Sequence, residues 1–431
     1  MSSLKHIARE IFLQTLSECT VESAFARNVD IRSGELRVCD AHYDLRRYSK
    51  VLTIAAGKAA HVMAESLYAI IGDRAGGIIA ASHAPERELP GFRYSVGGHP
   101  LPNAESLRAG AEIIDALRLL DEQSLVIYLI SGGASALMEV PFDAELTLED
   151  VIATYLALLH SGASIAEMNA LRKHLSAVKG GRMAQAAVPA QQVSLLISDV
   201  PASALDALAS GPTMPDPTTR EDCYAVAERY GLVARFPPRV RKLFVQRALT
   251  ETPKSGEPAF ARSQWHTLLS SEAVQQSAAA HASAAGFKVE IDNTCDDWDY
   301  ARAADYLLHR LSCLRAQHPR VCIVNTGEVT VSIPAEPGLG GRNQQFALYC
   351  ARKIAGKPIA VLSAGTDGID GNSDAAGAIV DGNTVIASGA GKIRQALAEF
   401  NAGPLLNALG DAIVIGHTGN NLRDLRMLLA E

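Results

Sequence analysis

Short apolar runs recur along the chain, and each gives way to a longer segment with the apolar spacing of a helix. Residues 51–56, 125–130 and 193–197 are apolar at nearly every position, as expected of strands whose sheet is covered on both faces. Strands that alternate with helices in this way are typical of a mostly parallel sheet. We therefore predict an α/β fold in which ligands bind beyond the carboxyl ends of the strands.

The pattern breaks at residues 250–264, where proline, serine and glycine gather in the stretch TETPKSGEPAFARSQ. Clusters of these residues mark loops and linkers. After the break, residues 320–333 and 358–369 supply the strands of a second half. The sequence thus predicts two α/β domains, one over 1–249 and a smaller one over 265–431.

The bulk composition narrows the class of partner. The 431 residues include 40 basic and 47 acidic ones, a formal net charge of −7, so the chain lacks the positive surface that binds nucleic acid. No uncharged run approaches the roughly 20 apolar residues of a membrane span. The seven cysteines are scattered and form no CxxC pair, which argues against disulfides and zinc. We expect a cytoplasmic protein whose partners are small molecules and not nucleic acid or a membrane. Whether it forms a homo-oligomer stays open.

Nearly every predicted strand ends in glycine accompanied by a charged or hydroxyl residue. In the N-terminal half these residues are Gly57, Lys58, Ser131, Gly132, Gly133, Ser135 and Asp199; in the C-terminal half they are Glu328, Gly340, Gly341, Arg342, Asn343 and Asp367. Glycine lets backbone N–H groups approach a ligand, and the start of a helix adds partial positive charge. These corners suit phosphate or carboxylate, although a glycine can also serve a tight turn by packing alone.

Four of these charged residues suggest chemistry. Lys58 falls where the first turn of a helix is expected, a poor place for a cation unless a ligand compensates. Arg342 offers a planar fork that matches phosphate or carboxylate oxygens. Asp199 and Glu328 could bind a hydroxyl, take its proton or hold a metal. Each also has an ordinary interpretation, as a solvated side chain or, for Asp199, as a cap of the turn before Pro201.

Two further segments carry clusters of polar residues. Residues 364–381, AGTDGIDGNSDAAGAIVD, contain four aspartates but lack the glutamate that closes an EF-hand loop. Asp367 is our candidate for holding magnesium together with nucleotide phosphates, and an acidic turn cluster is the alternative. Residues 167–186 supply three candidates for binding substrate or nucleotide: Asn169, Arg172 and Lys179. A solvated basic face explains the two cations equally well.

The common phosphate and nucleotide signatures are absent from the sequence. It contains no GxxxxGK[ST], since Gly57 and Lys58 are followed by alanine, and no GxGxxG or GxSxG. Phosphate would have to be bound without these devices. The missing dinucleotide fingerprint also counts against a nicotinamide-dependent enzyme.

The motifs AAGKAA, SGGASAL, MNALRKHLSAVKGGRMA, SDVP, ASGPT, GEVTV, GGRNQQFAL and AGTDGIDG occur in this order and are followed by DAAGAIVD. Together they resemble the class II glycerate kinase family, also called the MOFRL family, some of whose members are labelled hydroxypyruvate reductase. The resemblance runs from about residue 7 to the C-terminus. Two departures, NTGE where a double glycine often precedes the glutamate and ALASGP where a β-branched residue is usual, affect loop detail rather than charged groups.

The resemblance implies a Rossmann-like N-terminal domain, a smaller α/β MOFRL domain and an active site in the cleft between them. It further implies transfer of the γ-phosphoryl group of ATP to glycerate with Mg²⁺ or another divalent cation, typically from D-glycerate to 2-phosphoglycerate. The family's cleft residues are similar to Lys58, Asp199, Glu328 and Arg342, with Asp367 as a further candidate.

Phosphoryl transfer requires positioning and charge neutralisation more than covalent chemistry. We expect Lys58 and Arg342 to neutralise the phosphoryl group and the glycerate carboxylate, and which cation binds which anion stays open. We expect Asp199 to orient the acceptor hydroxyl, and it is also a candidate for its base. Glu328 and Asp367 would serve magnesium or substrate. Two alternatives stay open: an NAD(P)H-dependent hydroxypyruvate reductase, and a non-catalytic protein that binds organic acids between two lobes.

Overall fold

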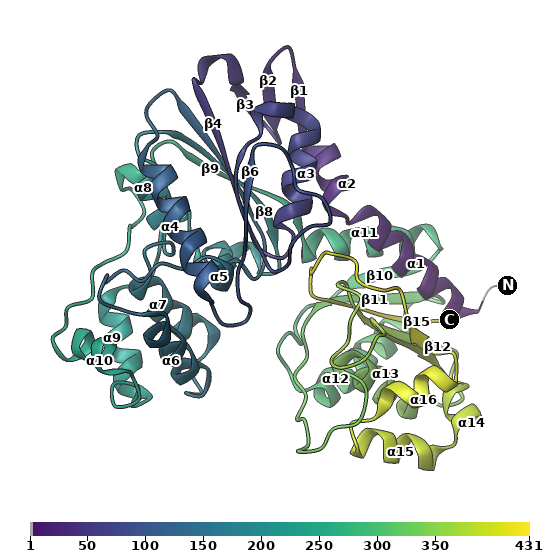
Figure 1. The fold of residues 1–431 in the computed structure, drawn as a ribbon. Coiled ribbons are helices and arrows are strands. Elements are labelled where there is room, and N and C mark those ends of the chain that lie inside the picture. The colour runs from purple at the N-terminus through teal and green to yellow at the C-terminus, as the bar shows by residue number, and fades with distance from the viewer. Residues whose placement is uncertain (1–2) are drawn as a thin grey trace. The chain divides into compact units, whose positions relative to one another are not determined.

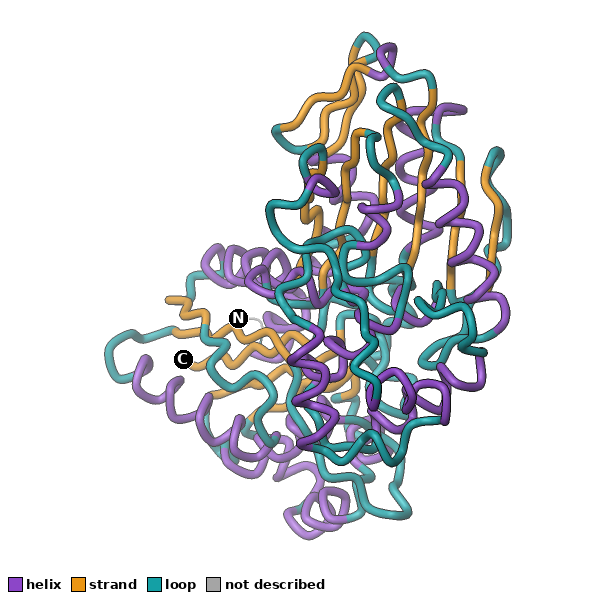
Figure 2. The backbone as a smooth tube through the Cα atoms, turned by 90° about the vertical axis from the view of Figure 1, so that its left-hand side faces the viewer, coloured by secondary structure: helices purple, strands orange, loops and turns teal. Residues whose placement is uncertain are grey.

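The computed structural model describes residues 3–431. The chain forms two compact units: one spans Val21–Leu269, and the other combines the residues up to Thr20 with Ser270–Glu431. Figure 1 labels the helices and strands, and Figure 2 distinguishes them by colour. Both units mix helices with strands, as the alternation of apolar runs predicts. No helix of the described residues is long and apolar enough to span a bilayer.

A six-stranded sheet forms the centre of the Val21–Leu269 unit, with strand order β6-β5-β4-β7-β8-β9. Its strands are β4 (Lys50–Ala56), β5 (Gly77–Ala81), β6 (Phe92–Val96), β7 (Ser124–Ile130), β8 (Gln191–Ser198) and β9 (Ser263–Ser270). Neighbouring strands from β6 to β8 are parallel. All residues of β7 are buried, in keeping with its unbroken apolar run. This strand order is that of a doubly wound fold and confirms the predicted fold class.

Helices and a small second sheet complete this unit. Its helices are α2 (Val21–Asn28), η1 (Leu45–Arg47), α3 (Ala60–Ile71), η2 (Gly72–Arg74), α4 (Ala104–Arg118), α5 (Ala134–Leu137), α6 (Leu148–Leu159), α7 (Ile165–Leu175), α8 (Arg182–Ala186), η3 (Ala202–Ser210), α9 (Arg220–Arg229), α10 (Pro238–Val245) and η4 (Pro258–Phe260). Strands β1 (Val29–Arg32), β2 (Glu35–Val38) and β3 (Ala41–Asp44) form an antiparallel sheet. The helices α6, α7, α9 and α10 share a separate apolar cluster that includes Leu158, Leu171 and Phe236.

The other unit is built on a mixed six-stranded sheet with order β10-β11-β15-β12-β13-β14. Its strands are β10 (Lys288–Ile291), β11 (Val321–Gly327), β12 (Ile359–Gly365), β13 (Gly377–Asp381), β14 (Ala412–Ile413) and β15 (Asp424–Ala430). Its helices are α1 (Leu4–Glu18), α11 (Ser271–Ala284), α12 (Tyr300–Arg315), α13 (Arg342–Lys353), α14 (Thr384–Ser388), α15 (Ala390–Ala398) and α16 (Ala402–Ala408). Strand β15 lies between β11 and β12 and is antiparallel to both.

The division into units differs from the expected boundaries, 1–249 and 265–431, at both junctions. Helix α1 packs against α11 and β12, with Phe12 buried and Lys5 Nζ 2.7 Å from Asp411 Oδ1. An amphipathic helix gives no sign in the sequence of which sheet it will cover, so only the fold reveals this placement. Strand β9 belongs to the first sheet, so the first unit extends past the proline-rich stretch to Leu269.

Candidate functional site

The centre of the first sheet is the place where its strand order reverses. Strands β4 and β7 lie side by side there in parallel, with Ala56 opposite Ile130, so the corners that follow them are neighbours. In such sheets the reversal point is where ligands bind. The backbone N–H of Lys58 donates to the carbonyl of Gly132 at 2.9 Å, and Ala59 N–H donates to Ser131 Oγ at 3.0 Å. These two amides are therefore engaged within the protein and do not form the open cradle that the glycine-rich corner suggested.

The double glycine after β7 has a specific reason. A Cβ atom built on Gly132 would lie 2.6 Å from Asp199 Oδ2, much closer than real Cβ atoms come to an oxygen. A Cβ on Gly133 would lie 3.2 Å from Cγ of Lys58 and 3.5 Å from Nε2 of His99. The absence of two side chains therefore lets three functional groups approach the same short stretch of backbone. We call Lys58, His99, Gly132, Gly133 and Asp199 the switch-point cluster.

The sequence reasoning missed His99, although a signal was present. Gly97 and Gly98 precede it directly after β6, which is the same pattern of glycine and polar residue that marked the other strand ends. Desolvation, together with the nearby charge of Lys58, lowers the pKa of His99. The imidazole is thus biased toward its neutral form, in which it can accept a hydrogen bond.

The expected helix after this corner is short. Helix α5 comprises the four residues Ala134–Leu137, and the half-buried Ser135 lies in that turn. Helix α3 begins at Ala60, so Lys58 precedes it rather than occupying its first turn. The side chain of Lys58 is exposed. Lys58 therefore lies just outside the N-terminal end of α3.

The basic segment 167–186 is more deeply packed than a solvated face. Lys179 is 0% exposed, and its ammonium pairs with the buried carboxylate of Glu139. The guanidinium carbon of Arg172 lies 4.7 Å from the ring centre of Tyr155. Burial is the main influence on the pKa of Lys179 and lowers it despite the attraction of Glu139. The structure thus places Lys179 in an internal ion pair.

Asn169, the third candidate from this segment, is 8% exposed on α7. Its Oδ1 accepts a hydrogen bond of 3.3 Å from Ser210 Oγ, at the end of η3. The loop that leads into η3 carries Asp199. Asn169 therefore ties α7 to the segment that follows Asp199.

In the second unit, three strand ends meet in one row. Asp424, the first residue of β15, lies opposite Gly327 at the end of β11 and opposite Gly365 at the end of β12. Glu328 and Asp367 follow these two strands. The sheet register therefore brings to one edge residues that are widely separated in sequence.

Arg342, the first residue of α13, binds two carboxylates at this edge. Its Nε and Nη2 donate to the two oxygens of Asp424 at 2.7 and 3.1 Å, and its Nη1 donates to Glu328 Oε2 at 2.7 Å. Burial disfavours the charged guanidinium, but Asp424 and Glu328 outweigh it and raise the pKa of Arg342. Asp424 also accepts a hydrogen bond of 3.0 Å from Nη2 of the buried Arg426. The edge is thus a chain of alternating charges, which we call the Arg342 network: Glu328, Arg342, Asp424 and Arg426.

A second acid holds the start of α13. The carboxylate of Asp370 accepts hydrogen bonds from the backbone N–H groups of Asn343 at 3.0 Å and Gln344 at 2.8 Å. A Cβ on Gly341 would collide with Asp370, which accounts for that glycine. Burial is the largest influence on Asp370 and raises its pKa to about 7, although the two N–H groups oppose this. Asp370 therefore fixes the turn from which Arg342 projects.

The adjoining residues close the loop before α13. Gly340, with φ of 143°, donates its N–H to Asn372 Oδ1 at 2.8 Å. Asn343 Oδ1 accepts a hydrogen bond of 2.6 Å from Ser363 Oγ on β12. The polar side chain of Asn343 is therefore committed to the protein's own structure.

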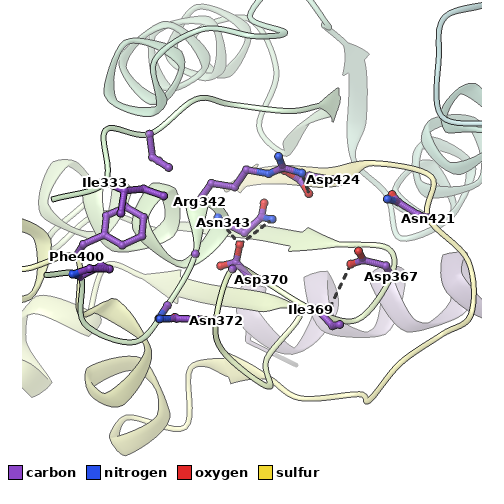
Figure 3. Close-up of a pocket in the computed structure, with 15 residues that line it drawn as sticks. Ile333, Arg342, Asn343, Asp367, Ile369, Asp370, Asn372, Phe400, Asn421 and Asp424 are labelled. Atoms are coloured by element: carbon purple, nitrogen blue, oxygen red, sulfur yellow. Dashed lines mark hydrogen bonds and ion pairs between the residues drawn. The ribbon is translucent and has the colours of Figure 1, made fainter. Parts of the chain in front are cut away.

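A cavity of about 610 Å³ opens at this edge. Its lining includes Gly340, Gly341, Arg342, Asn343, Asp367, Asp370 and Asp424, together with the apolar Ile333 and Phe400. Figure 3 shows Arg342 beside Asp424 in the lining, with Ile333 and Phe400 grouped away from Asp367 and Asn421. The structure thus gathers the candidates of the C-terminal half around a single cavity of this unit, apart from Glu328, which joins through Arg342.

The aspartates of segment 364–381 do not form one cluster. Asp367 and Asp370 line the cavity, whereas Asp374 is exposed and Asp381 lies 3.6 Å from Lys5 Nζ. Among the described residues, no group of three histidine, cysteine or acidic side chains is arranged to hold a metal ion. Magnesium commonly binds through one or two carboxylates together with substrate phosphates, and Asp367 fits that limited role.

Comparisons with known proteins agree with these features. Residues 7–245 match the family model described as a domain of unknown function, DUF4147, and residues 321–424 match the MOFRL family. A D-glycerate 2-kinase of Thermotoga maritima is 34% identical over 87% of this chain and 89% of its own length. A glycerate 2-kinase of Pyrococcus horikoshii is 34% identical over 97% of this chain and 96% of its own. The crystal structure of a glycerate kinase from T. maritima has a TM-score of 0.86 at 32% identity and covers 99% of each chain.

The fold and these relatives define the class: the protein is a kinase with a two-domain α/β fold. The chain belongs to the DUF4147 and MOFRL family, in which relatives are named glycerate 2-kinase. A protein of Agrobacterium vitis whose name refers to hydroxypyruvate reductase is 37% identical over 89% of this chain and 88% of its own length. Both labels that the sequence resemblance implied are therefore found among the relatives.

Proposed function

We propose that the protein transfers the γ-phosphoryl group of ATP to the 2-hydroxyl of D-glycerate, giving 2-phosphoglycerate and ADP. The names of the relatives support glycerate as the substrate class. The observation that carries the proposal is the switch-point cluster, in which the carboxylate of Asp199 lies close to Gly132 and the side chain of Lys58 lies close to Gly133. A kinase needs such a pair, because an acceptor hydroxyl must lose a proton while a phosphoryl group must be neutralised.

The roles follow from the charges. The hydroxyl oxygen of glycerate attacks the γ-phosphorus, the bond from that phosphorus to the β–γ bridging oxygen breaks, and the proton of the hydroxyl passes to Asp199. Lys58 neutralises the transferring group, and its exposed side chain can move to follow it. The polar backbone and hydroxyls of Gly57, Ser131 and Ser135 shape this corner. Arg342 binds an anion of the substrates, either the glycerate carboxylate or a phosphate, through its planar fork.

Magnesium enters the proposal with the nucleotide. When bound, the ion would neutralise negative charge on the nucleotide phosphates. Asp367, which lines the cavity beside Arg342, would supply the protein's carboxylate. The cytoplasm is the proposed location, since none of the cysteines forms a disulfide in the described part of the chain.

The decisive experiment is ATP-dependent turnover of D-glycerate with the product identified. Enolase, pyruvate kinase and lactate dehydrogenase added in sequence oxidise NADH when 2-phosphoglycerate forms, whereas 3-phosphoglycerate gives no signal without a mutase. A signal that needs both ATP and D-glycerate is expected. Oxidation of NADH by hydroxypyruvate without ATP and without the coupling enzymes would instead support the reductase alternative, and binding of glycerate without turnover would support a non-catalytic protein.

A further inference from the structure

We propose that Glu328 holds the place of a substrate anion on Arg342, and that Asp424 is the residue that keeps Arg342 in position when Glu328 is displaced. The inference rests on the proposed function only in taking the anion to be a carboxylate or a phosphate. It concerns the state of the site before substrate binds.

The two carboxylates bound to Arg342 differ in how firmly they are held. Asp424 has a side chain that is 3% exposed, and it bonds to Arg426 as well as to Arg342. It is also the first residue of a strand paired on both sides. The side chain of Glu328 is 36% exposed and bonds to Arg342 through one oxygen. Asp424 is therefore fixed by the fold, whereas Glu328 can turn toward water.

The geometry of the guanidinium separates the two contacts. Asp424 binds one edge of the fork, through Nε and Nη2, which is a bidentate arrangement. Glu328 takes the remaining nitrogen, Nη1, with a single hydrogen bond. An incoming carboxylate or phosphate can bind Nη1 and the second hydrogen of Nη2 together, which is the planar pairing that arginine favours. A substrate anion thus gains two bonds where Glu328 makes one.

The site also gives a ligand access to this group. Arg342 and Asp424 both line the cavity, and Figure 3 shows the two side chains next to each other in that lining. Without Glu328, the guanidinium of Arg342 would have Asp424 as its one carboxylate partner while the cavity is empty. Glu328 binds this guanidinium until the substrate arrives. The carboxylate of Glu328 is then released and becomes available to another partner.

The first test measures binding without turnover. Isothermal titration of the full-length protein with D-glycerate and with inorganic phosphate, in the absence of nucleotide and metal, compares the wild type with Glu328→Gln. We expect the variant to bind at least one of the two anions about 3- to 10-fold more tightly, because the competing carboxylate is gone. Asp374→Asn is the matched control, since it removes one negative charge from an exposed position of the same unit. Equal or weaker binding by Glu328→Gln, or equal tightening by the control, would overturn the displacement.

The second test concerns Asp424. Asp424→Asn keeps the size of the side chain but removes its charge, and we expect it to weaken anion binding by about 10- to 100-fold. Arg342→Lys keeps the positive charge and loses the fork, and it serves as the second variant if Asp424→Asn does not fold. If Asp424 acts through Arg342, the double variant Asp424→Asn/Arg342→Lys binds no more weakly than Arg342→Lys alone. Additive losses, or Arg342→Lys binding as tightly as the wild type, would show that Asp424 does not position Arg342.

These outcomes are separable from those of the turnover assay. Tighter binding of inorganic phosphate by Glu328→Gln would support the displacement even if D-glycerate were not phosphorylated. Active wild-type enzyme combined with unchanged binding in Glu328→Gln would refute the displacement and leave the proposed function intact.

Discussion

Gly132→Ala isolates the position of Asp199 with the smallest possible change. The φ angle of Gly132 lies outside the left-handed region, so alanine meets no backbone strain there. The new Cβ would lie 2.6 Å from Asp199 Oδ2, whereas ordinary contacts begin at 3.4 Å, so the carboxylate must retreat by at least about 0.8 Å. A misplacement of about 1 Å at a reacting group costs about 100-fold in rate. We therefore expect the kcat/KM for D-glycerate to fall by roughly that factor.

The assay is the coupled measurement of 2-phosphoglycerate, run beside thermal unfolding. Asp199 follows β8 and is half-buried, so we expect the unfolding midpoint to change little. Gly391→Ala provides the matched control, because no atom beyond its chain neighbours and its own helix backbone lies within 4 Å of its built Cβ and its φ is also ordinary. A Gly132→Ala variant with kcat/KM within twofold of the wild type would refute the reasoning, since Asp199 would then tolerate displacement from the acceptor hydroxyl.

Three further predictions concern charge. Lys58→Ala should lower kcat by about 10²- to 10³-fold while the free energy of unfolding changes by less than about 0.5 kcal/mol, because the side chain is exposed; normal turnover would remove Lys58 from the site. Folding raises the pKa of Asp370 from 3.8 to about 7, so the folded state binds this proton more tightly and stability falls as pH rises between these values, by up to about 4 kcal/mol. Urea unfolding at pH 4.5 and 7 should show this slope in the wild type and a flatter one in Asp370→Asn, and equal slopes would contradict it. Lys179→Met should cost roughly 3–5 kcal/mol in the same measurement, because Glu139 would be left buried without its cation, and Glu139→Gln in the same chain should restore part of the loss.

The fold class and the strand-end positions could be predicted because they depend on local patterns. A buried parallel strand must be apolar throughout, and the apolar runs before Gly57, Ser131 and Asp199 are β4, β7 and β8. The sequence predicts that the glycines stand at strand-end corners, but it does not reveal which neighbouring side chain requires a glycine there. Gly132 is small because Asp199 occupies the space beside it, and that contact joins residues far apart in sequence.

Other features depend on long-range pairing and left no local signal. Asp424 stands in an unremarkable stretch, NNLRDLRM, and its importance arises from the register that sets it opposite Gly327 and Gly365. Lys179 belongs to a basic segment that would suit a surface equally well, and its burial follows from Glu139 on a different loop. Charge in a sequence reveals which chemistry is available, whereas the partner of each charge is decided by tertiary packing.

The position of β15 has a consequence for synthesis. This strand follows all the other strands of its sheet in the chain, yet it lies in the middle of that sheet between β11 and β12. While a ribosome is still translating residues 424–430, β11 and β12 each expose an unpaired edge, and such edges recruit strands from other chains. The nascent polypeptide therefore passes through a stage at risk of aggregation after residues 21–269 have already emerged. Asp424, which holds Arg342, belongs to the same strand. This unit therefore cannot complete its site before β15 has been synthesised.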